Sequence, residues 1–137
     1  ELNLRVNLQV INRILPQMIA NKYGKIVTVG SIYTDKPNLN LIHYTTAKAA
    51  LEGFTKSLAL EVAPKGINVN MVSPSVISTE LTADIPEKVK LMTIAQTPLR
   101  RLARAEDVAG AISFLVGEQS SFLVGENIRL NGGQVMV

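Results

Sequence analysis

The chain has 137 residues, enough for one domain and too few for two of ordinary size. It contains no cysteine and one histidine, so disulfides and thiolate metal sites are excluded and no metal site is expected. The basic residues behind its net charge of +3 are scattered and aromatic residues make up only 4%, so nucleic-acid binding is not expected. No apolar run approaches the ~18–20 residues of a membrane span, so a membrane protein is not expected either. The expected location is the cytoplasm.

The first elements in the chain are a helix and a short strand. Apolar residues at every third or fourth position predict a helix over residues 4–19, in which Pro16 is expected to cause a kink. A β-branched run in YGKIVTVGS, residues 23–31, predicts a buried strand. Residues 32–41 are rich in Asp, Asn and Pro and are expected to form a loop.

Helices and strands continue to alternate in the rest of the chain. The predicted helices are 42–63, 86–95 and 105–116, and the predicted strands are 67–72 and the run ENIRL near the end. A turn-rich loop is expected over residues 73–80. This alternation predicts an α/β fold whose parallel strands are joined by right-handed crossovers.

The stretch HYTTAKAALEGF places Tyr44 and Lys48 four residues apart, and therefore on one face of a helix. A phenol titrates near 10, and a nearby cation favours its phenolate form. Such a tyrosine can exchange a proton with a carbonyl or alcohol oxygen, which the hydroxyl of Ser31, at the end of the preceding strand, would hold. Taken alone, this spacing also occurs in ordinary amphipathic helices with a buried tyrosine and a solvated lysine.

The order of these features resembles the short-chain dehydrogenase/reductase family over the whole chain. Ser31 precedes Tyr44 by 13 residues, and Lys48 follows by four, which is this family's arrangement. The segment ELNLRVNLQV is similar to the family's helix with an active-site asparagine, here Asn3. The segment VSPSVISTEL is similar to the loop after the family's sixth strand, and GENIRLNGG to its closing segment.

The resemblance implies a role for each matching residue. Tyr44 would be the general acid/base, and Lys48 would favour its phenolate and bind the nicotinamide ribose. Ser31 would orient the substrate oxygen, and Asn3 would hold a water that links Lys48 to solvent. These four would be the catalytic residues. The residues implied to bind NADP or NAD are Tyr44, Lys48, Pro74, Ile77 and Thr79.

Three features depart from the family pattern. One is Asn131, which stands in place of the common aspartate before the terminal glycine pair and carries no expected consequence. Ser75 stands where the family usually has glycine after Pro74, and no glycine-rich turn for a pyrophosphate is present. The chain, residues 1–137, is therefore interpreted as the C-terminal catalytic portion of one Rossmann-like, doubly wound domain without its N-terminal dinucleotide-binding units. The choice between NAD and NADP is expected to depend on those units. The chain by itself is expected to be unstable and inactive.

Within the family, the segment from Ala47 to Pro74 most resembles 3-oxoacyl-carrier-protein reductases. The implied reaction is reduction of a ketone, or oxidation of the alcohol, on a small molecule that is either free or bound to an acyl carrier protein. Sugar, alcohol and steroid dehydrogenases are alternatives within the family. Arg100, Arg101 and Arg104 form a basic cluster that is either solvated surface or a contact for an acidic carrier.

A different class of function is a catalytically silent fragment or scaffold that acts through oligomer contacts. The resemblance implies a homodimer or homotetramer, with the helices matching 3–20 and 43–63 in one interface. Residues 80–96 would form the substrate lid, and apolar residues between 81 and 92 fit either an acyl substrate or ordinary packing. Tyr33 is either a substrate contact or loop surface.

Overall fold

The computed structural model describes residues 2–137, with the side chain of residue 81 outside the description. Three parallel strands form the main sheet in the order β1 (Gly24–Val29), β2 (Ile67–Pro74), β5 (Asn127–Leu130). Their register pairs Val29 with Val72 and Ser73 with Arg129. A second, two-stranded parallel sheet joins β3 (Ile77–Ser78) to β4 (Ala103–Arg104).

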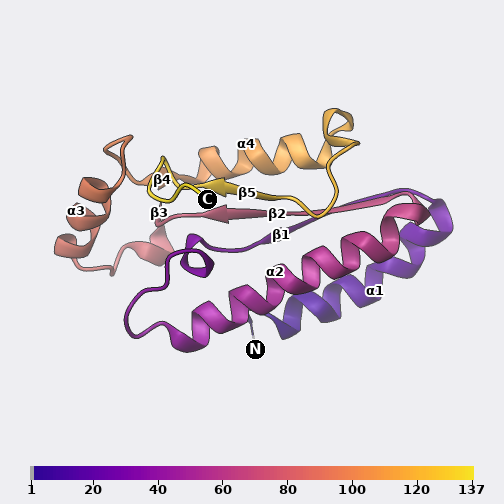
Figure 1. Cartoon of the computed structure of the whole chain (residues 1–137), viewed down its shortest axis with the longest axis horizontal. Coiled ribbons are helices and arrows are strands. Elements are labelled where there is room, and N and C mark those ends of the chain that lie inside the picture. The colour runs from indigo at the N-terminus through magenta and orange to yellow at the C-terminus, as the bar shows by residue number, and fades with distance from the viewer. Residues whose placement is uncertain (1) are drawn as a thin grey trace.

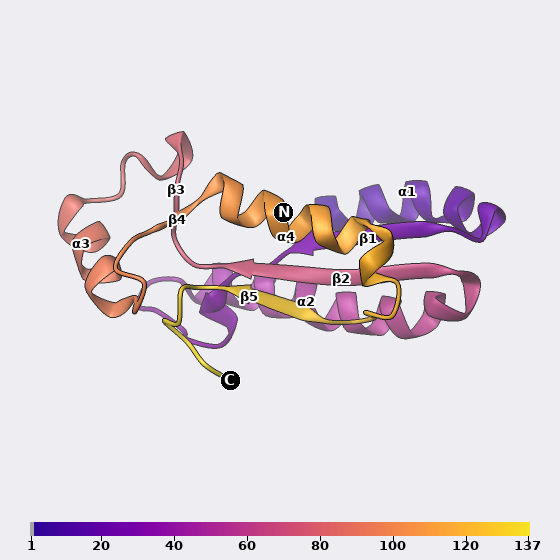
Figure 2. The same ribbon diagram turned by 90° about the horizontal axis from the view of Figure 1, so that it is seen from above.

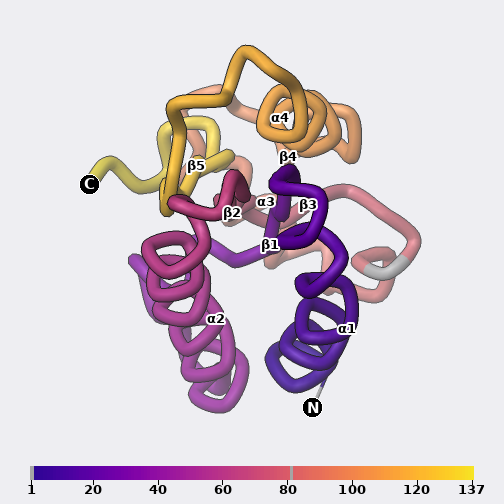
Figure 3. The backbone as a smooth tube through the Cα atoms, turned by 90° about the vertical axis from the view of Figure 1, so that its right-hand side faces the viewer, coloured from indigo at the N-terminus to yellow at the C-terminus, as the bar shows by residue number. Residues whose placement is uncertain are grey.

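Helices lie on both faces of the main sheet. Figures 1 and 3 show α1 (Arg5–Asn21) and α2 (Ile42–Val62) together on one face and α4 (Ala105–Val116) on the other. Helix α3 (Glu87–Gln96) lies beyond the carboxyl ends of the strands, next to β3 and β4, as the view from above also shows (Figure 2). Short 3-10 helices cover Ile32–Thr34, Ala63–Lys65, Glu80–Thr82 and Glu118–Ser120.

The hydrophobic core is divided between the two faces of the sheet, because successive side chains of a strand point to opposite faces. The larger cluster fills the space under α1 and α2 and consists of Ile11, Ile26, Leu58, Ala59, Val62, Ile67 and Val69. The cluster under α4 consists of Val72, Val108 and Leu115. Asn70 is 1% exposed, and its amide donates to Leu123 O and accepts from Glu126 N, which fixes the chain just before β5.

The predicted α/β fold with a parallel sheet is confirmed, and α4 has the predicted bounds. The strand predicted over 67–72 extends to Pro74, because β5 pairs with it there, so the prediction that the loop begins at residue 73 was wrong. Helix α1 includes Pro16 and continues to Asn21. The strands β3 and β4 were not predicted.

Turn geometry accounts for the sharp return from α2 to β2. Gly66 has a φ of 81°, in the left-handed region, and a Cβ there would collide with the carbonyl oxygen of Lys22. The turn therefore brings the end of α1 close to the start of β2. No helix within residues 2–137 combines the length and apolar character that crossing a bilayer requires.

Candidate active site

A cleft of about 540 Å³ lies at the carboxyl ends of β1 and β2. This is where open α/β sheets bind their ligands, and the volume is in the range of small-molecule sites. The cleft brings together every site residue predicted from the sequence: Asn3, Ser31, Tyr44, Lys48, Pro74, Ile77 and Thr79. Its wall also includes Tyr33, Thr82 and Ile85. The sequence singled out Tyr33 as a possible substrate contact and Ile85 as part of the apolar lid face, but not Thr82.

Ser31 is placed by the end of β1 and by a tight turn that follows it. The amide of Gly30 donates to Val72 O at 2.8 Å, so the sheet is ordered up to this point. Ser31 is 5% exposed and caps the 3-10 helix Ile32–Thr34, its Oγ accepting from Tyr33 N at 3.3 Å. Because that bond uses Ser31 Oγ as an acceptor, the hydroxyl proton remains available to a substrate oxygen.

Tyr44 and Lys48 lie in the first two turns of α2, on the face toward the sheet. Lys48 Nζ donates to Val29 O at 2.8 Å and lies 5.7 Å from the centroid of the Tyr44 ring. That separation is within the range of a cation–π contact. The Lys48 side chain is buried, and this desolvation lowers the pKa of its ammonium group. Two of the three Nζ donors remain for other partners.

Tyr33 packs edge-on against Tyr44. The two ring centroids are 6.3 Å apart and the planes meet at 76°, which is a favoured aromatic geometry. Since Tyr33 also lines the cleft and donates its amide to Ser31 Oγ, it contacts both hydroxyl-bearing candidates. The sequence left Tyr33 between substrate contact and loop surface, and the structure places it in the cleft wall.

The loop after β2 forms the opposite wall. Pro74 is the buried last residue of β2, and Ser75 N donates to Leu130 O at 3.0 Å. Ser75 has no positive φ, so a glycine is not required there. Thr79 caps the 3-10 helix Glu80–Thr82, its amide donating to Thr82 Oγ1 at 2.9 Å. Thr79 therefore has a structural role at the start of this short helix, and its contact with a cofactor stays a prediction.

Asn3 lies half-buried in the cleft wall, just before α1. Its backbone carbonyl accepts from Asn7 Nδ2 at 3.4 Å, one turn further along. The bound water proposed from the resemblance stays a prediction.

The residues of the cleft fit the nicotinamide–ribose end of a dinucleotide. Lys48 and Thr79 offer hydrogen-bonding groups for a ribose and an amide, while Pro74 and Ile77 offer an apolar surface for a flat ring. The sequence has no glycine-rich turn that would hold a pyrophosphate. The fit therefore concerns one half of the cofactor.

The arginine cluster has partners within the chain. Arg101 pairs with Asp107 at 2.6 Å, Arg104 approaches the same carboxylate at 3.9 Å, and Arg100 donates to Ala95 O at 2.7 Å. A contact with an acidic carrier stays a prediction.

Only part of the apolar face expected for the lid, residues 80–96, is directed into the cleft. Ile85 lines the cleft, whereas three apolar residues of α3 are 42–57% exposed: Val89, Leu91 and Met92.

Comparisons with known proteins find close relatives along the whole chain. The family model described as "Enoyl-(Acyl carrier protein) reductase" matches residues 1–134. The 3-oxoacyl-[acyl-carrier-protein] reductase FabG of Buchnera aphidicola is 40% identical over 136 residues, which are 99% of this chain and 56% of that protein. The Salmonella typhimurium protein of the same name is 37% identical over 137 residues, again 56% of its length. The chain thus spans little more than half of these relatives.

Solved structures give the same result. The 3-oxoacyl-[acyl-carrier protein] reductase from Brucella melitensis matches with a TM-score of 0.94 and 32% identity, over 98% of this chain and 51% of that one. A structure of such a reductase with bound NAD, from the same organism, matches with a TM-score of 0.90, over 98% and 50%. A putative gluconate dehydrogenase from Agrobacterium tumefaciens matches with a TM-score of 0.92 and 28% identity, over 98% and 54%.

Proposed function

Since this chain belongs to the short-chain dehydrogenase/reductase family, we propose that the protein is a nicotinamide-dependent oxidoreductase that reduces the ketone of a 3-oxoacyl thioester. The observation that carries the proposal is the convergence of Ser31, Tyr44 and Lys48 in one cleft, with donors left over for a substrate and a ribose. The relatives named as 3-oxoacyl-[acyl-carrier-protein] reductases support the substrate class.

The hydroxyls of Ser31 and Tyr44 would hold the substrate carbonyl oxygen. The Ser31 proton donates to that oxygen and polarises the C=O bond, and Tyr33 N keeps the serine oxygen in place from behind. The nicotinamide, when bound, supplies hydride to the carbonyl carbon. As the C=O π pair moves onto oxygen, Tyr44 gives its phenolic proton to that oxygen, and the ketone becomes an alcohol.

Lys48 would assist Tyr44, the proton donor. Its positive charge, 5.7 Å from the ring centroid, stabilises the phenolate left after proton transfer. Burial strengthens this interaction because the surroundings screen it poorly. One of the two spare Nζ donors would bind the ribose, and the other would pass a proton from a water held by Asn3.

The remaining assignments belong to this proposal. Tyr44, Lys48, Pro74, Ile77 and Thr79 would hold the nicotinamide ribose end of NADP or NAD. The acyl group would be carried on a small thiol or on an acyl carrier protein. The enzyme would work in the cytoplasm as a homodimer or homotetramer.

The proposal is tested by following the oxidation of NADPH and NADH in the presence of an acetoacetyl thioester. Tyr44→Phe keeps the ring that packs on Tyr33 but removes the proton donor, so kcat is expected to fall by roughly 10²–10⁴-fold. Tyr23→Phe is the matched control, because Tyr23 is 56% exposed and its hydroxyl bonds only to Glu118 among the contacts described. It is expected to keep the wild-type rate.

Full turnover by Tyr44→Phe would refute the mechanism. Turnover of sugars, simple alcohols or steroids, but not of the thioester, would keep the mechanism and refute the substrate class. A protein that gives no change in reduced-nicotinamide fluorescence would instead be a scaffold.

A further inference from the structure

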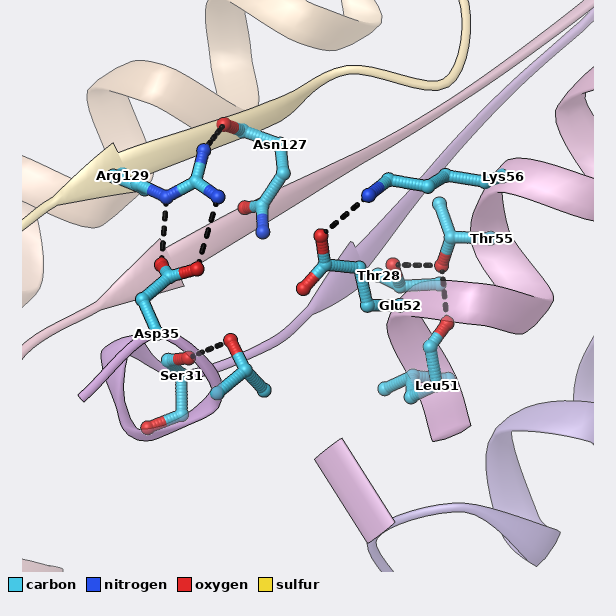
Figure 4. Close-up of polar contacts among 10 residues, drawn as sticks. Thr28, Ser31, Asp35, Leu51, Glu52, Thr55, Lys56, Asn127 and Arg129 are labelled. Atoms are coloured by element: carbon cyan, nitrogen blue, oxygen red, sulfur yellow. Dashed lines mark hydrogen bonds and ion pairs between the residues drawn. The ribbon is translucent and has the colours of Figure 1, made fainter. Parts of the chain in front are cut away.

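Asp35 and Arg129 form a two-pronged ion pair beside the cleft. Arg129 Nε donates to Asp35 Oδ2 at 2.6 Å, and Arg129 Nη2 donates to Asp35 Oδ1 at 3.0 Å. Figure 4 shows the two parallel bonds, with the carboxylate above the turn that carries Ser31. Paired N–H···O bonds of this kind are the strongest and most directional that an arginine makes.

The pair joins parts of the fold that are distant in sequence. Asp35 is the residue after the 3-10 helix Ile32–Thr34, so it closes the turn that begins at Ser31 and contains Tyr33. Arg129 lies on β5, which is separated from β1 by β2 in the sheet. The two residues are 94 positions apart. The contact therefore ties the Ser31 turn to the far strand of the sheet.

The surroundings make this pair stronger than an ordinary surface contact. The Asp35 side chain is 14% exposed and that of Arg129 is 29% exposed, so solvent screens them only in part. The hydrogen bonds from Arg129 to Asp35, together with the charge of Asp35, raise the pKa of the Arg129 guanidinium. Removal of Asp35 would leave the partly buried Arg129 guanidinium with only the smaller attraction of Glu52, and removal of Arg129 would leave the Asp35 carboxylate without its hydrogen-bond partner.

On the side of α2 the turn is held by the buried Ile32 and by Tyr33, which packs against Tyr44. On the side of β5 it has few other contacts. Lys36 Nζ bonds to Gln96 at 3.2 Å, but this contact is exposed. Thr34 Oγ1 donates to Ser31 O at 2.9 Å, which tightens the turn without fixing it to the sheet. Among the side-chain contacts described, the ion pair is the partly buried link between this turn and β5.

We infer that Asp35 and Arg129 are positioning residues, which hold the Ser31 hydroxyl and the Tyr33 ring at the distances that Tyr44 requires. Neither touches the substrate. Asp35 orients the turn, and Arg129 orients Asp35. The kinetic part of this inference rests on the proposed function, whereas the order of the turn does not.

The chain offers a matched control in Arg101 and Asp107. This pair has the same two-pronged geometry, at 2.6 and 3.0 Å, but lies at the start of α4. There the arginine lowers the pKa of Asp107 to about 2. Asp107→Asn therefore removes an ion pair of the same geometry, more exposed at 28% for Asp107 and 43% for Arg101, without touching the Ser31 turn.

The test compares Asp35→Asn, Arg129→Gln, their double variant and Asp107→Asn in the full-length protein. A misplaced turn is expected to lower kcat with the thioester by roughly tenfold or more in both single variants, with the KM for the nicotinamide cofactor within about twofold of wild type. The double variant is expected to be no slower than the slower single variant, because the two residues act as one unit. Asp107→Asn is expected to keep kcat.

Hydrogen–deuterium exchange of residues 30–36 supplies a readout that does not depend on activity. It is expected to accelerate in both single variants and to stay at the wild-type rate in Asp107→Asn. Arg129→Lys keeps the positive charge but cannot form the two parallel hydrogen bonds, so its exchange rate over residues 30–36 is expected to lie between those of the wild type and Arg129→Gln. This variant still tests the inference if Asp35→Asn does not fold. Unchanged exchange over 30–36, or additive losses of kcat, would overturn the inference. A wild-type protein inactive on the thioester would refute the proposed function alone.

Discussion

Gly30 stands at the point where β1 passes into the Ser31 turn, and its neighbours leave no room for a side chain. A Cβ there would lie 2.5 Å from Ser73 Oγ and 2.7 Å from Met71 Sδ. Both Ser73 and Met71 are fully buried, so neither can move aside freely. The identity of this residue therefore governs where Ser31 lies.

Gly30→Ala is expected to lower the free energy of unfolding by about 1–3 kcal/mol, as overpacked cores do. Denaturant unfolding measures the change. Gly110→Ala is the control, because nothing lies within 4 Å of its Cβ position in α4, and it is expected to stabilise by about 0.5–1 kcal/mol. The added Ser73→Ala change is expected to recover part of the loss at Gly30, and no recovery would contradict the steric account.

Lys48 gives the structure a characteristic dependence on pH. Burial lowers its pKa below the ordinary 10.5, so between the two values the unfolded chain binds the proton that the folded chain has released. The penalty for burying the charge is complete below the lowered pKa and disappears as the pH rises through this window. The contribution of Lys48 to the free energy of unfolding therefore increases as the pH rises through this window.

Unfolding of the wild type and of Lys48→Met at a series of alkaline pH values checks this sign. The free energy of unfolding of the wild type relative to the variant is expected to rise as the pH approaches 10.5. A difference that stays flat, or falls, would show that the lysine is not desolvated. Activity is expected to be lost in Lys48→Met at every pH, because the phenolate then has no counter-charge.

At the scale of elements, a buried pair of hydroxyls fixes α2 against β1. Thr28 Oγ1 and Thr55 Oγ1 are 2.8 Å apart, and Thr55 Oγ1 donates to Leu51 O at 2.7 Å (Figure 4). Both threonines are at most 3% exposed. This link sits two turns after Lys48, so it helps to set the height of Tyr44 and Lys48 above the sheet.

Thr55→Val is expected to cost about 1–3 kcal/mol, because Thr28 loses a buried partner while the shape of the core is kept. The double variant Thr28→Val/Thr55→Val is expected to lose less free energy of unfolding than the two single variants lose together, since no hydroxyl is then left unpaired. Chemical denaturation of the four proteins decides this. Strict additivity would mean that the two hydroxyls do not interact.

The elements that the sequence predicted well are those set by local periodicity. Helix α4 has an unbroken apolar face and acidic residues in its first turn, and its predicted bounds were correct. Strand β2 was predicted too short because Ser73 and Pro74 become strand only through pairing with β5, more than fifty residues away. The two-residue strands β3 and β4 have no periodicity at all, and only the tertiary fold brings them together.

At the scale of the whole molecule, α1 exposes an apolar stripe on the face away from the sheet. Val6, Val10 and Ile14 recur every four residues and are 40%, 53% and 39% exposed. Figure 3 shows α1 beside α2 on this side of the molecule. Such a stripe suits the helix-to-helix contact of the proposed homodimer.

Val10→Glu is expected to lower the mass of the particle in solution, measured by light scattering after size exclusion, because it buries a charge in that contact. Val89→Glu is the control, a valine of similar exposure, 42%, on α3. If the mass of the Val10→Glu particle equals that of the wild type, the contact between the subunits does not involve this face of α1.

For the site, the sequence led to every candidate in the cleft but not to what holds the candidates in place. Ser31, Tyr44 and Lys48 were found because their spacing matches a known pattern and their chemistry is explicit in the side chains. Asp35 and Arg129 carry no such signal. Their pairing follows from the order β1-β2-β5 and from the turn after Ser31, neither of which is visible in periodicity.

The 94 residues between Asp35 and Arg129 also set an order of events during synthesis. A ribosome that adds ~5–20 residues per second needs roughly 5–20 s to travel that distance. Until then the Ser31 turn exists without its anchor, and closing so long a loop carries an entropy cost that only the completed sheet repays. The nascent chain can therefore fix the Ser31 turn to the far strand only after β5 has been synthesised.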